Sequence, residues 1–354
     1  MSTTAAGKRR LRRSDCAAPG WGRVRRGRGF SYVNAHGDPI DDPQKLERVR
    51  ALAIPPAWKE VWICPDLMGH LQATGIDAAG RKQYLYHEKW REHRDRAKFE
   101  KMLSFGRGLP RLRRRLAADL DGAEPTRDRV LACAVRLLDV GVFRIGSEQY
   151  ADDDGGLGLA TLHREHVTVH EDSVEFDFPA KGGQRRRQVI SDPASFDVVA
   201  ALRRRRAGGE QLLAYRERRR WHDIRSDDIN DYVKLRLGDE FSAKDFRTWN
   251  GTVMAAVSLA THGLDANSKS ARKRAINRAV SDVAQLLGNT PAVARRSYID
   301  PRVFDRYRSG WTIAGVLARI PDPGGIDDRV RARVERGVID LLEDDHDSAA
   351  LERI

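Results

Sequence analysis

The chain of 354 residues is strongly basic: 32% of its residues are charged, the formal net charge is +13 and the pI is near 9.9. Its length allows about two domains with a sizeable core, and no run of about 18 apolar residues could span a bilayer. The basic N-terminus lacks the apolar segment of a secretory signal, and the scattered Cys16, Cys64 and Cys133 give neither a disulfide framework nor zinc-site spacing. We therefore expect a soluble protein of a reducing compartment whose partner is acidic, nucleic acid rather than membrane.

The first 29 residues carry nine basic side chains against one acid, Asp15. A segment of this composition buries too little apolar surface to order itself. We expect residues 1–29 to form a flexible basic arm, which either adds contacts to phosphates or only solubilises the chain.

Residues 30–103 show short strands and turns around one helix at about 42–52, which Pro55-Pro56 closes. Strands of an antiparallel sheet are expected at 61–64, 69–74 and 82–87. In the last of these the side chains alternate, so that Gln83, Leu85 and His87 face one way and Lys82, Tyr84 and Tyr86 the other. A lysine and two tyrosines on one face can contact phosphates and base edges together; an ordinary half-exposed strand with aromatic cross-strand pairs is the alternative.

A charged helix is expected at 90–103 and a linker at 104–110, with the domain boundary between them. The second part then has a helix with an apolar stripe at 127–140. Three strands between 167 and 190 form a meander, and its second turn places Lys181 at a hairpin tip. By itself such a lysine is better explained as a solvated turn residue. From about residue 193 onward we expect helices, with the arginine runs at 203–206 and 218–220 on their solvated or phosphate-facing surface.

The stretch 288–301 ends a long helical pattern at Gly288 and starts a new helix at Thr290-Pro291, which read as the cap and first position. This short helix ends at Tyr298, close to Arg295 and Arg296. Cations stabilise an ionised phenol, so such a tyrosine could serve as a nucleophile. The alternative is a surface helix whose tyrosine packs against a neighbour.

Other motifs carry less chemistry. The run at Asp152 to Asp154 beside two glycines is expected to be a solvated loop, and His163, His166 and His170 lack the cysteine or carboxylate support of a zinc site. No Walker motif is present, so ATP is not implied. No carboxylate cluster is persuasive either, so neither a catalytic metal nor another cofactor is expected. Residues 321–354 hold a net charge of −5 and form either an appended helix or a disordered tail.

Transfer of a DNA phosphoryl group to a tyrosine needs an aligned phenol, cations around the non-bridging oxygens and an acid for the leaving alkoxide, which can contribute roughly 10²- to 10⁴-fold. Arginine suits the oxygens because its guanidinium donates in a charged fork, and lysine can supply the proton. The chain offers Arg144, Lys181, Arg247, Asn289 and Tyr298 for these roles.

The order of motifs, Phe143-Arg144-Ile145-Gly146, Lys181-Gly182, Lys244-Asp245-Phe246-Arg247-Thr248, Asn289-Thr290-Pro291 and Arg296-Ser297-Tyr298, resembles a type IB DNA topoisomerase. The resemblance is strongest to the small poxvirus-like bacterial members and runs from about residue 30 to 320. It implies an α+β fold: a small antiparallel β-rich N-terminal domain (30–103) and a larger, mainly helical catalytic domain with a short β-meander (104–320), forming a clamp around duplex DNA. The basic arm (1–29) and the acidic extension (321–354) flank these domains.

The resemblance also implies roles. Tyr298 would form a 3′-phosphotyrosyl bond, Arg144 and Arg247 would stabilise the phosphorane, and Lys181 would be the general acid. Asn289 stands where most relatives have histidine, so it would donate a hydrogen bond without moving a proton. The residues implied to contact DNA are Gln83, Tyr84, Tyr86, Tyr150 and Lys244.

The implied activity is relaxation of supercoils without ATP or metal, by a monomer acting on double-stranded DNA in the cytoplasm, associated with the nucleoid. Tyrosine recombinases are an alternative, but they usually have His-x-x-Arg where this chain has Lys244-x-x-Arg247, and their N-terminal domain is helical. A non-catalytic DNA-binding module is a second alternative, which would leave the joint presence of Arg144, Lys181, Arg247 and Tyr298 unexplained.

Overall fold

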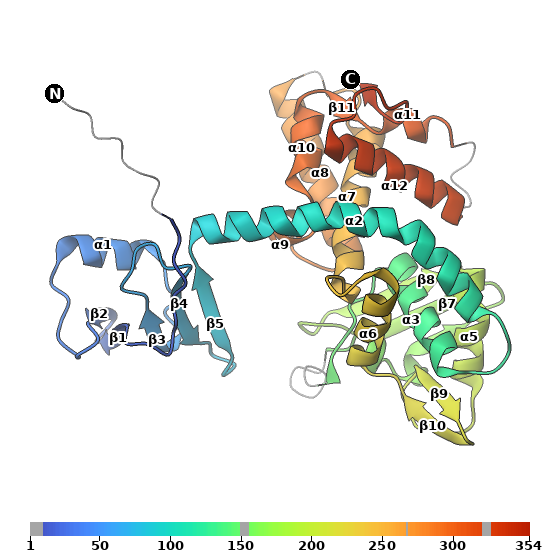
Figure 1. Cartoon of the computed structure of the whole chain (residues 1–354), viewed down its shortest axis with the longest axis horizontal. Helices are drawn as coiled ribbons and strands as arrows, with labels where there is room; N and C mark the ends of the chain where they lie inside the picture. Colours follow the sequence, from blue (N-terminus) through green and yellow to red (C-terminus); the bar gives the residue numbers. More distant parts are fainter. Residues whose placement is uncertain (1–9, 149–155, 267, 321–326) are drawn as a thin grey trace. The chain divides into compact units, whose positions relative to one another are not determined.

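The computed structural model describes residues 10–148, 156–266, 268–320 and 327–354 (Figure 1). The chain divides into two compact units, residues 1–100 and 101–354. The first contains a five-stranded antiparallel sheet and the second is mainly helical, so the expected α+β class is confirmed. No helix in the described ranges is long and apolar enough to cross a membrane.

The sheet of the first unit has the strand order β2-β1-β3-β4-β5, with helix α1 (Pro43–Ala51) between β2 and β3 in sequence. Its core consists of Val49, Ile54, Val61, Ile63 and Ala73, all buried. Asp42 caps α1 by accepting from the backbone N–H groups of residues 44 and 45. The strands are β1 (Trp21–Arg26), β2 (Gly29–Val33), β3 (Lys59–Ile63), β4 (Leu71–Ile76) and β5 (Lys82–Tyr86).

The expectation of a flexible arm through residue 29 was wrong, because β1 pairs with both β2 and β3. Trp21 packs against the core, and the Arg23 guanidinium donates to the carbonyls of Ile54, Pro55 and Trp58. Even residue 12 exchanges backbone hydrogen bonds with residues 68 and 70. At least one of the arginines that made the segment look disordered, Arg23, is thus used as a donor to backbone carbonyls of the folded unit.

The expected linker at 104–110 was also wrong: α2 is continuous from Glu88 to Leu120, and the division between the two units falls inside it. Gly106 brings the helix close to Trp249, since a Cβ there would lie 2.5 Å from the indole. Phe105, Leu109 and Leu112 are buried at helical spacing. Gly106 therefore serves close packing and does not break the helix.

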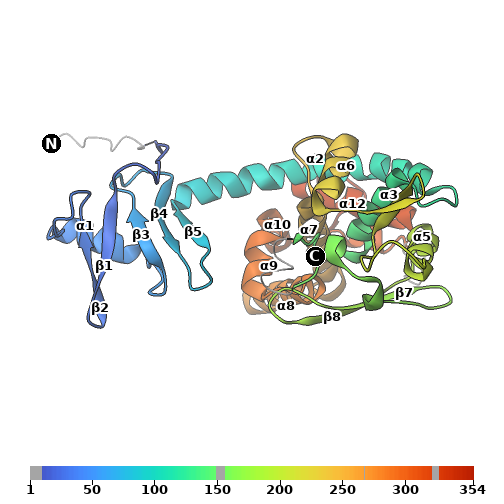
Figure 2. The same ribbon diagram turned by 90° about the horizontal axis from the view of Figure 1, so that it is seen from below.

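Helix α3 (Arg127–Gly141) lies at the centre of the second unit and is capped by Thr126. The expected meander is present as the antiparallel sheet β6 (Val167–Val169), β7 (Val174–Pro179) and β8 (Arg185–Ile190). Strand β8 runs beside the C-terminal part of α8 (Figure 2). The other helices before residue 300 are α5 (Pro193–Arg204), α6 (Ser226–Leu237), α7 (Ala243–His262), α8 (Lys269–Leu287) and α9 (Pro291–Ser297), with short 3-10 turns η1 (Leu159–Thr161) and η2 (Arg164–His166).

The arginine run 218–220 does not lie on a helix as expected. It belongs to a hairpin of β9 (Ala214–Glu217) and β10 (Arg220–Asp223), in which the Tyr215 and His222 rings stack at 5.2 Å. The turn uses Arg218 and Arg219 at positive φ, 44° and 68°. Hairpin turns of this kind normally contain glycine or asparagine, so the residue types here did not predict a turn.

The described part of the C-terminal extension, residues 327–354, contains a packed helix. Helix α12 (Asp328–Glu343) contacts α7, α10 and α11 (Figure 1), and Val338, Leu341 and Leu342 on it are buried. Of the two alternatives for residues 321–354, the described part 327–354 agrees with the appended helix. The remaining elements are α10 (Pro301–Arg308), β11 (Trp311–Thr312), α11 (Ala314–Leu317) and β12 (Glu352–Arg353).

Candidate active site

Arg144 follows directly on the end of α3. Val142 caps that helix in the left-handed conformation, with φ 53°, which turns the chain sharply. Phe143 is buried against Phe176 at 5.0 Å and Phe178 at 6.2 Å between ring centroids. The apolar anchor fixes the residue before Arg144, so the arginine side chain starts from a rigid backbone.

Two glycines hold the other side of this loop. Gly146 has φ +79°, and a Cβ on Gly158 would lie 2.3 Å from the Gly146 nitrogen. The Leu159 N–H donates to the Arg144 carbonyl at 2.8 Å. Only glycines permit this approach of two backbone segments, and the approach locks the position of Arg144.

Arg247 lies on α7 and is only 3% exposed. Its Nη1 donates to the Val142 carbonyl at 2.6 Å and its Nη2 to the Leu287 carbonyl at 2.7 Å, while its buried Nε has no partner in the described part of the chain. Burial, and after it the neighbouring Arg144, lower the pKa of Arg247 to about 10. At neutral pH the guanidinium therefore remains charged.

The junction between α8 and α9 completes the site. Gly288 ends α8 in the left-handed conformation (φ 58°), and Thr290 caps α9. Arg144 Nη2 donates to the Gly288 carbonyl at 2.8 Å and to Asn289 Oδ1 at 2.7 Å. The buried Nδ2 of Asn289 has no partner among the described residues. The junction thus presents one unused amide donor beside a held guanidinium.

Tyr298 is the C-terminal cap of α9 and is partly buried. Its carbonyl accepts from Thr252 Oγ1 at 3.4 Å, and a Cβ on Gly251 would lie 2.7 Å from the same carbonyl oxygen. The Arg247 guanidinium lies 5.4 Å from the Tyr298 ring centroid. Helix α7 therefore supplies both the cation over the ring and the residues that fix the tyrosine backbone.

The cation nearest the phenol ring comes from α7 and not from α9, although the sequence drew attention to Arg295 and Arg296. The Arg295 guanidinium lies 4.8 Å from the ring centroid of Phe304 on α10. Proximity in sequence pointed to the wrong arginine, since side chains on one helix diverge around its axis.

Lys181 is exposed at the turn between β7 and β8, where Gly182 and Gly183 have positive φ and the Ala180 N–H donates to the Gln184 carbonyl at 2.7 Å. Ala180 and Gln184 line a pocket of about 500 Å³ that Arg144 also lines. The structure thus groups Arg144, Arg247, Asn289 and Tyr298, and places Lys181 on the hairpin that borders the same pocket.

Arg186 is a charged residue of this pocket that sequence reasoning missed. Its Nη2 donates to the Leu286 carbonyl at 3.0 Å and its Nε to Gln188 Oε1 at 2.8 Å. Burial and then Arg144 lower its pKa. Strand alternation could have revealed it, because Arg185 and Arg187 on the opposite face pair with acids of β7 while Arg186 turns inward.

Comparison with known proteins assigns the chain to a family. The family model of the eukaryotic DNA topoisomerase I catalytic core matches residues 87–311, and the model of the bacterial DNA topoisomerase IB N-terminal domain matches residues 29–77. The chain belongs to the DNA topoisomerase I family. The core match contains all five residues of the candidate active site, and it places the chain with the type IB topoisomerases and not with the tyrosine recombinases.

Individual relatives agree. A DNA topoisomerase 1B of Acanthamoeba polyphaga mimivirus is 27% identical over 295 residues, which is 81% of this chain and 87% of the relative. DNA topoisomerase 1 of Schizosaccharomyces pombe is 30% identical over 167 residues, 47% of this chain but 19% of the longer relative. DNA topoisomerase 1B of vaccinia virus (strain Copenhagen) is 18% identical over 287 residues, 79% of this chain and 87% of the relative.

In the first unit of the topoisomerase, β5 shows the expected alternation. Tyr84 is 46% and Tyr86 39% exposed, and their rings lie 6.2 Å apart at 17°. Lys82 Nζ lies 5.9 Å from the Tyr84 ring centroid. Gln83 is half-buried on the other face, where its Nε2 donates to Asp77 Oδ2 at 2.9 Å. The exposed face thus carries a lysine and two stacked aromatic rings.

The structure describes one of the two other residues implied to contact DNA, Lys244, and does not describe the second. Lys244 is exposed in the first turn of α7, one turn before the buried Arg247. Tyr150 lies outside the described residues.

A separate cluster that contains two histidines lies at η2. Ligand atoms of His163, Glu165 and His166 lie within 4.8 Å of one another, but His166 Nδ1 accepts from the His163 N–H at 3.1 Å. A neutral His166 then carries its proton on Nε2, the atom 3.8 Å from Glu165. His170 instead contacts Glu175 at 3.2 Å. This bonding does not favour a metal site, which needs a free imidazole lone pair.

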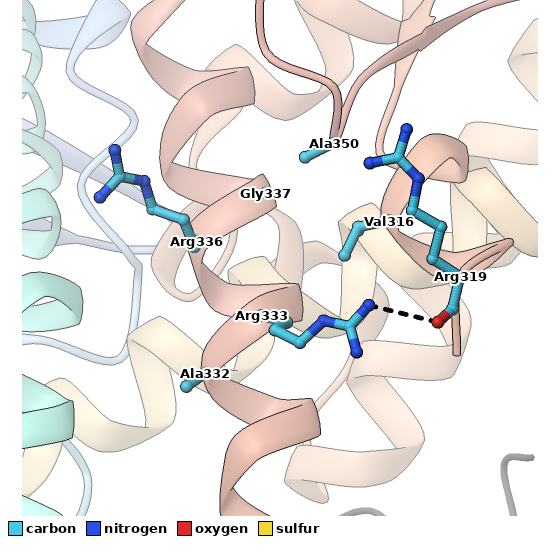
Figure 3. A pocket seen from close by; sticks show the side chains of 7 residues that line it. All are labelled: Val316, Arg319, Ala332, Arg333, Arg336, Gly337 and Ala350. Atoms are coloured by element: carbon cyan, nitrogen blue, oxygen red, sulfur yellow. Dashed lines mark hydrogen bonds between the residues drawn. The ribbon is translucent and has the colours of Figure 1, made fainter. Parts of the chain in front are cut away.

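A separate pocket of about 300 Å³ lies between α11, α12 and the C-terminal segment (Figure 3). Arg319, Arg333 and Arg336 line it together with small apolar residues, and Arg333 donates to the Arg319 carbonyl at 3.2 Å. Its described lining holds no nucleophile or carboxylate, so the pocket offers no chemistry for strand cleavage.

Proposed function

We propose that this topoisomerase relaxes supercoiled DNA by cleaving one strand with Tyr298, letting that strand rotate and resealing it. The phenol gives its proton to solvent and its oxygen attacks a phosphodiester phosphorus. A 3′-phosphotyrosyl bond forms, the bond to the 5′ oxygen breaks, and that oxygen takes up a proton to leave as a 5′-hydroxyl strand. The reverse reaction reseals the strand. Each step exchanges one phosphoester bond for another, so the bond energy is conserved and the cycle needs no ATP.

The observation that carries the proposal is the convergence of Arg144, Arg247 and Tyr298 at the α8–α9 junction. Charge accumulates on the non-bridging oxygens of the phosphorane, and fixed donors that require no reorganisation stabilise it. Arg247 Nε and Asn289 Nδ2 are buried donors without a partner in the described chain. Because an unpaired buried donor costs about 1–3 kcal/mol, a phosphate oxygen that accepts from both would recover this energy, and no metal is required.

Lys181 is proposed as the general acid that protonates the 5′ oxygen as it leaves. Its place on an exposed hairpin that borders the Arg144 pocket allows it to approach a bound strand. In resealing, the neutral amine takes the proton back from the attacking 5′-hydroxyl. Asn289 is proposed to act only through hydrogen bonds, since an amide does not exchange protons at neutral pH.

Both units are proposed to contact DNA. Tyr84 and Tyr86 of the first unit contact the duplex through exposed aromatic faces, and Gln83 contacts it only after leaving Asp77. In the second unit, Lys244 and Tyr150 contact the phosphate backbone near the site. The protein acts on double-stranded DNA as a monomer, in the cytoplasm at the nucleoid.

Relaxation of a negatively supercoiled plasmid in EDTA without ATP tests the proposal. The wild type should give a ladder of relaxed topoisomers, and a supercoiled band that persists would refute the proposed activity. Tyr298→Phe is the matched variant: it should form no covalent protein–DNA adduct and should still bind duplex. An adduct formed by this variant would show that Tyr298 is not the nucleophile.

A further inference from the structure

Asp139, near the end of α3, is the centre of a buried charge cluster. Its carboxylate accepts from Arg113 of α2 at 2.8 and 3.0 Å and from Arg331 of α12 at 3.0 and 2.7 Å. The Asp139 side chain is 1% exposed and that of Arg113 4%. The consecutive helices α2 and α3 and the distant helix α12 thus meet at one carboxylate.

Helix α12 contributes an acid as well as a base to the cluster. Glu335 accepts from the opposite edge of Arg113 at 2.7 Å through both of its oxygens. Asp328, at the start of α12, accepts from Arg136 of α3 at 2.8 Å. The cluster therefore matches cations with carboxylates in fork-shaped pairs, the arrangement that fixes geometry most firmly.

The backbone of Asp139 connects the cluster to the active site. Its carbonyl accepts from Arg331 Nη2 at 3.0 Å and from Asn250 Nδ2 at 3.1 Å. On α7, Asn250 lies three residues after Arg247. On α3, Asp139 lies three residues before Val142, whose carbonyl accepts a hydrogen bond from Arg247. On each helix, about one turn thus separates two contacts: the one at the Asp139 carbonyl, which Arg331 also binds, and the one between Arg247 and the Val142 carbonyl.

We infer that α12, which lies beyond the region matched by the family core, is a positioning element of the active site. Through Arg331 and Glu335 it holds the end of α3 against α7, and so sets the places of Arg144 and Arg247. The inference rests on the proposed roles of those arginines. Burying ion pairs gives little or no net stability compared with apolar packing, whereas misplacing a catalytic group by about 1 Å can cost roughly 10²-fold in rate.

Arg331→Met tests the inference, with Arg336→Met as the matched control. Arg336 lies on the same helix (Figure 3), but its side chain is 74% exposed and its ion pair is a local one, with Asp340 four residues further along the helix. Single-turnover adduct formation on saturating duplex should be at least about tenfold slower in Arg331→Met, with duplex affinity within about twofold of wild type, and unchanged in Arg336→Met. Arg331→Lys, which keeps the charge without the fork, should recover only part of the rate. If Arg331→Met does not fold, Glu335→Gln serves instead.

Equal adduct rates for Arg331→Met and Arg336→Met, at a temperature where both are folded, would overturn the inference and leave α12 a passive brace. Failure of the wild type to form an adduct would refute the proposed function instead. In that case hydrogen exchange tests the positioning role of α12 without any need for activity. Backbone amides of residues 142–146 should exchange faster in Arg331→Met than in Arg336→Met, relative to the amides of β7. Equal exchange would refute the positioning role.

Discussion

Arg144 donates to the side-chain oxygen of Asn289 at 2.7 Å, so the two ends of this amide have different tasks. The oxygen orients an arginine, and the nitrogen remains as an unused buried donor. In the proposed mechanism the asparagine thus both holds a cation and donates a hydrogen bond to a phosphate oxygen. A histidine could reproduce this only as a neutral ring that accepts from Arg144 through one nitrogen and donates through the other.

Asn289→His should therefore retain relaxation activity at pH 8 and lose it as the pH falls. The ordinary imidazole pKa is about 6.5, and neighbouring Arg144 and Arg247 would lower that of the introduced ring, so protonation would occur only below that pH. The imidazolium has no acceptor for Arg144. Relaxation rates measured between pH 5.5 and 8.5 should show an acid limb in the variant beyond that of the wild type.

Asn289→Ala is the control for this prediction, because it removes both the acceptor and the donor. Loss of one such donor typically costs about 10²- to 10³-fold, and a comparable loss is expected at every pH. Inactivity of Asn289→His at all pH values would mean that the pocket accepts only the amide.

Lys181→Ala should slow cleavage by about 10²- to 10⁴-fold, the usual contribution of a general acid. A substrate whose bridging 5′ oxygen is replaced by sulfur should restore most of the rate, because a thiolate leaves without protonation. Arg144→Ala provides the contrast, since it removes charge stabilisation and should stay slow on both substrates. Equal defects of Lys181→Ala on oxygen and sulfur substrates would contradict the acid role.

The sequence located these residues better than it located their surroundings. The family resemblance singled out Arg144, Arg247 and Tyr298, which the structure places close together. Local residue types predicted that Gly288 ends α8 and that Thr290 and Pro291 start α9. The long-range contacts were not readable: the cation over Tyr298 comes from α7, Arg186 points inward from a run of three arginines, and Trp249 accounts for Gly106. Such features depend on which elements pack together, and composition or periodicity within one element does not specify that.

The exposed face of β5 makes a prediction about DNA affinity. Lys82→Ala should weaken duplex binding and reduce the slope of log affinity against log salt by about 0.9, as expected for one lost phosphate contact. Tyr84→Ala should weaken binding with the slope unchanged, because an aromatic contact releases no counterion. Fluorescence anisotropy with Tyr298→Phe at several salt concentrations separates these effects. An unchanged affinity in both variants would exclude this face as a DNA-contacting surface.

Asp139 makes a prediction about acid stability. Burial by itself would raise the pKa of its carboxyl, but Arg331 and Arg113 hold that pKa well below the ordinary value. A carboxyl whose pKa is lower in the folded than in the unfolded chain contributes stability that is complete above the unfolded value, about 3.9, and is lost as the pH falls below it. In the wild type, the urea concentration at the unfolding midpoint should therefore decrease as the pH is lowered below about 4.

Asp139→Asn should already be less stable at pH 7, by about 3–5 kcal/mol, because Arg113 and Arg331 lose their charged partner. The urea concentration at its midpoint should depend less on pH between 4 and 2. Parallel pH profiles of the two proteins would show that other carboxylates govern acid unfolding.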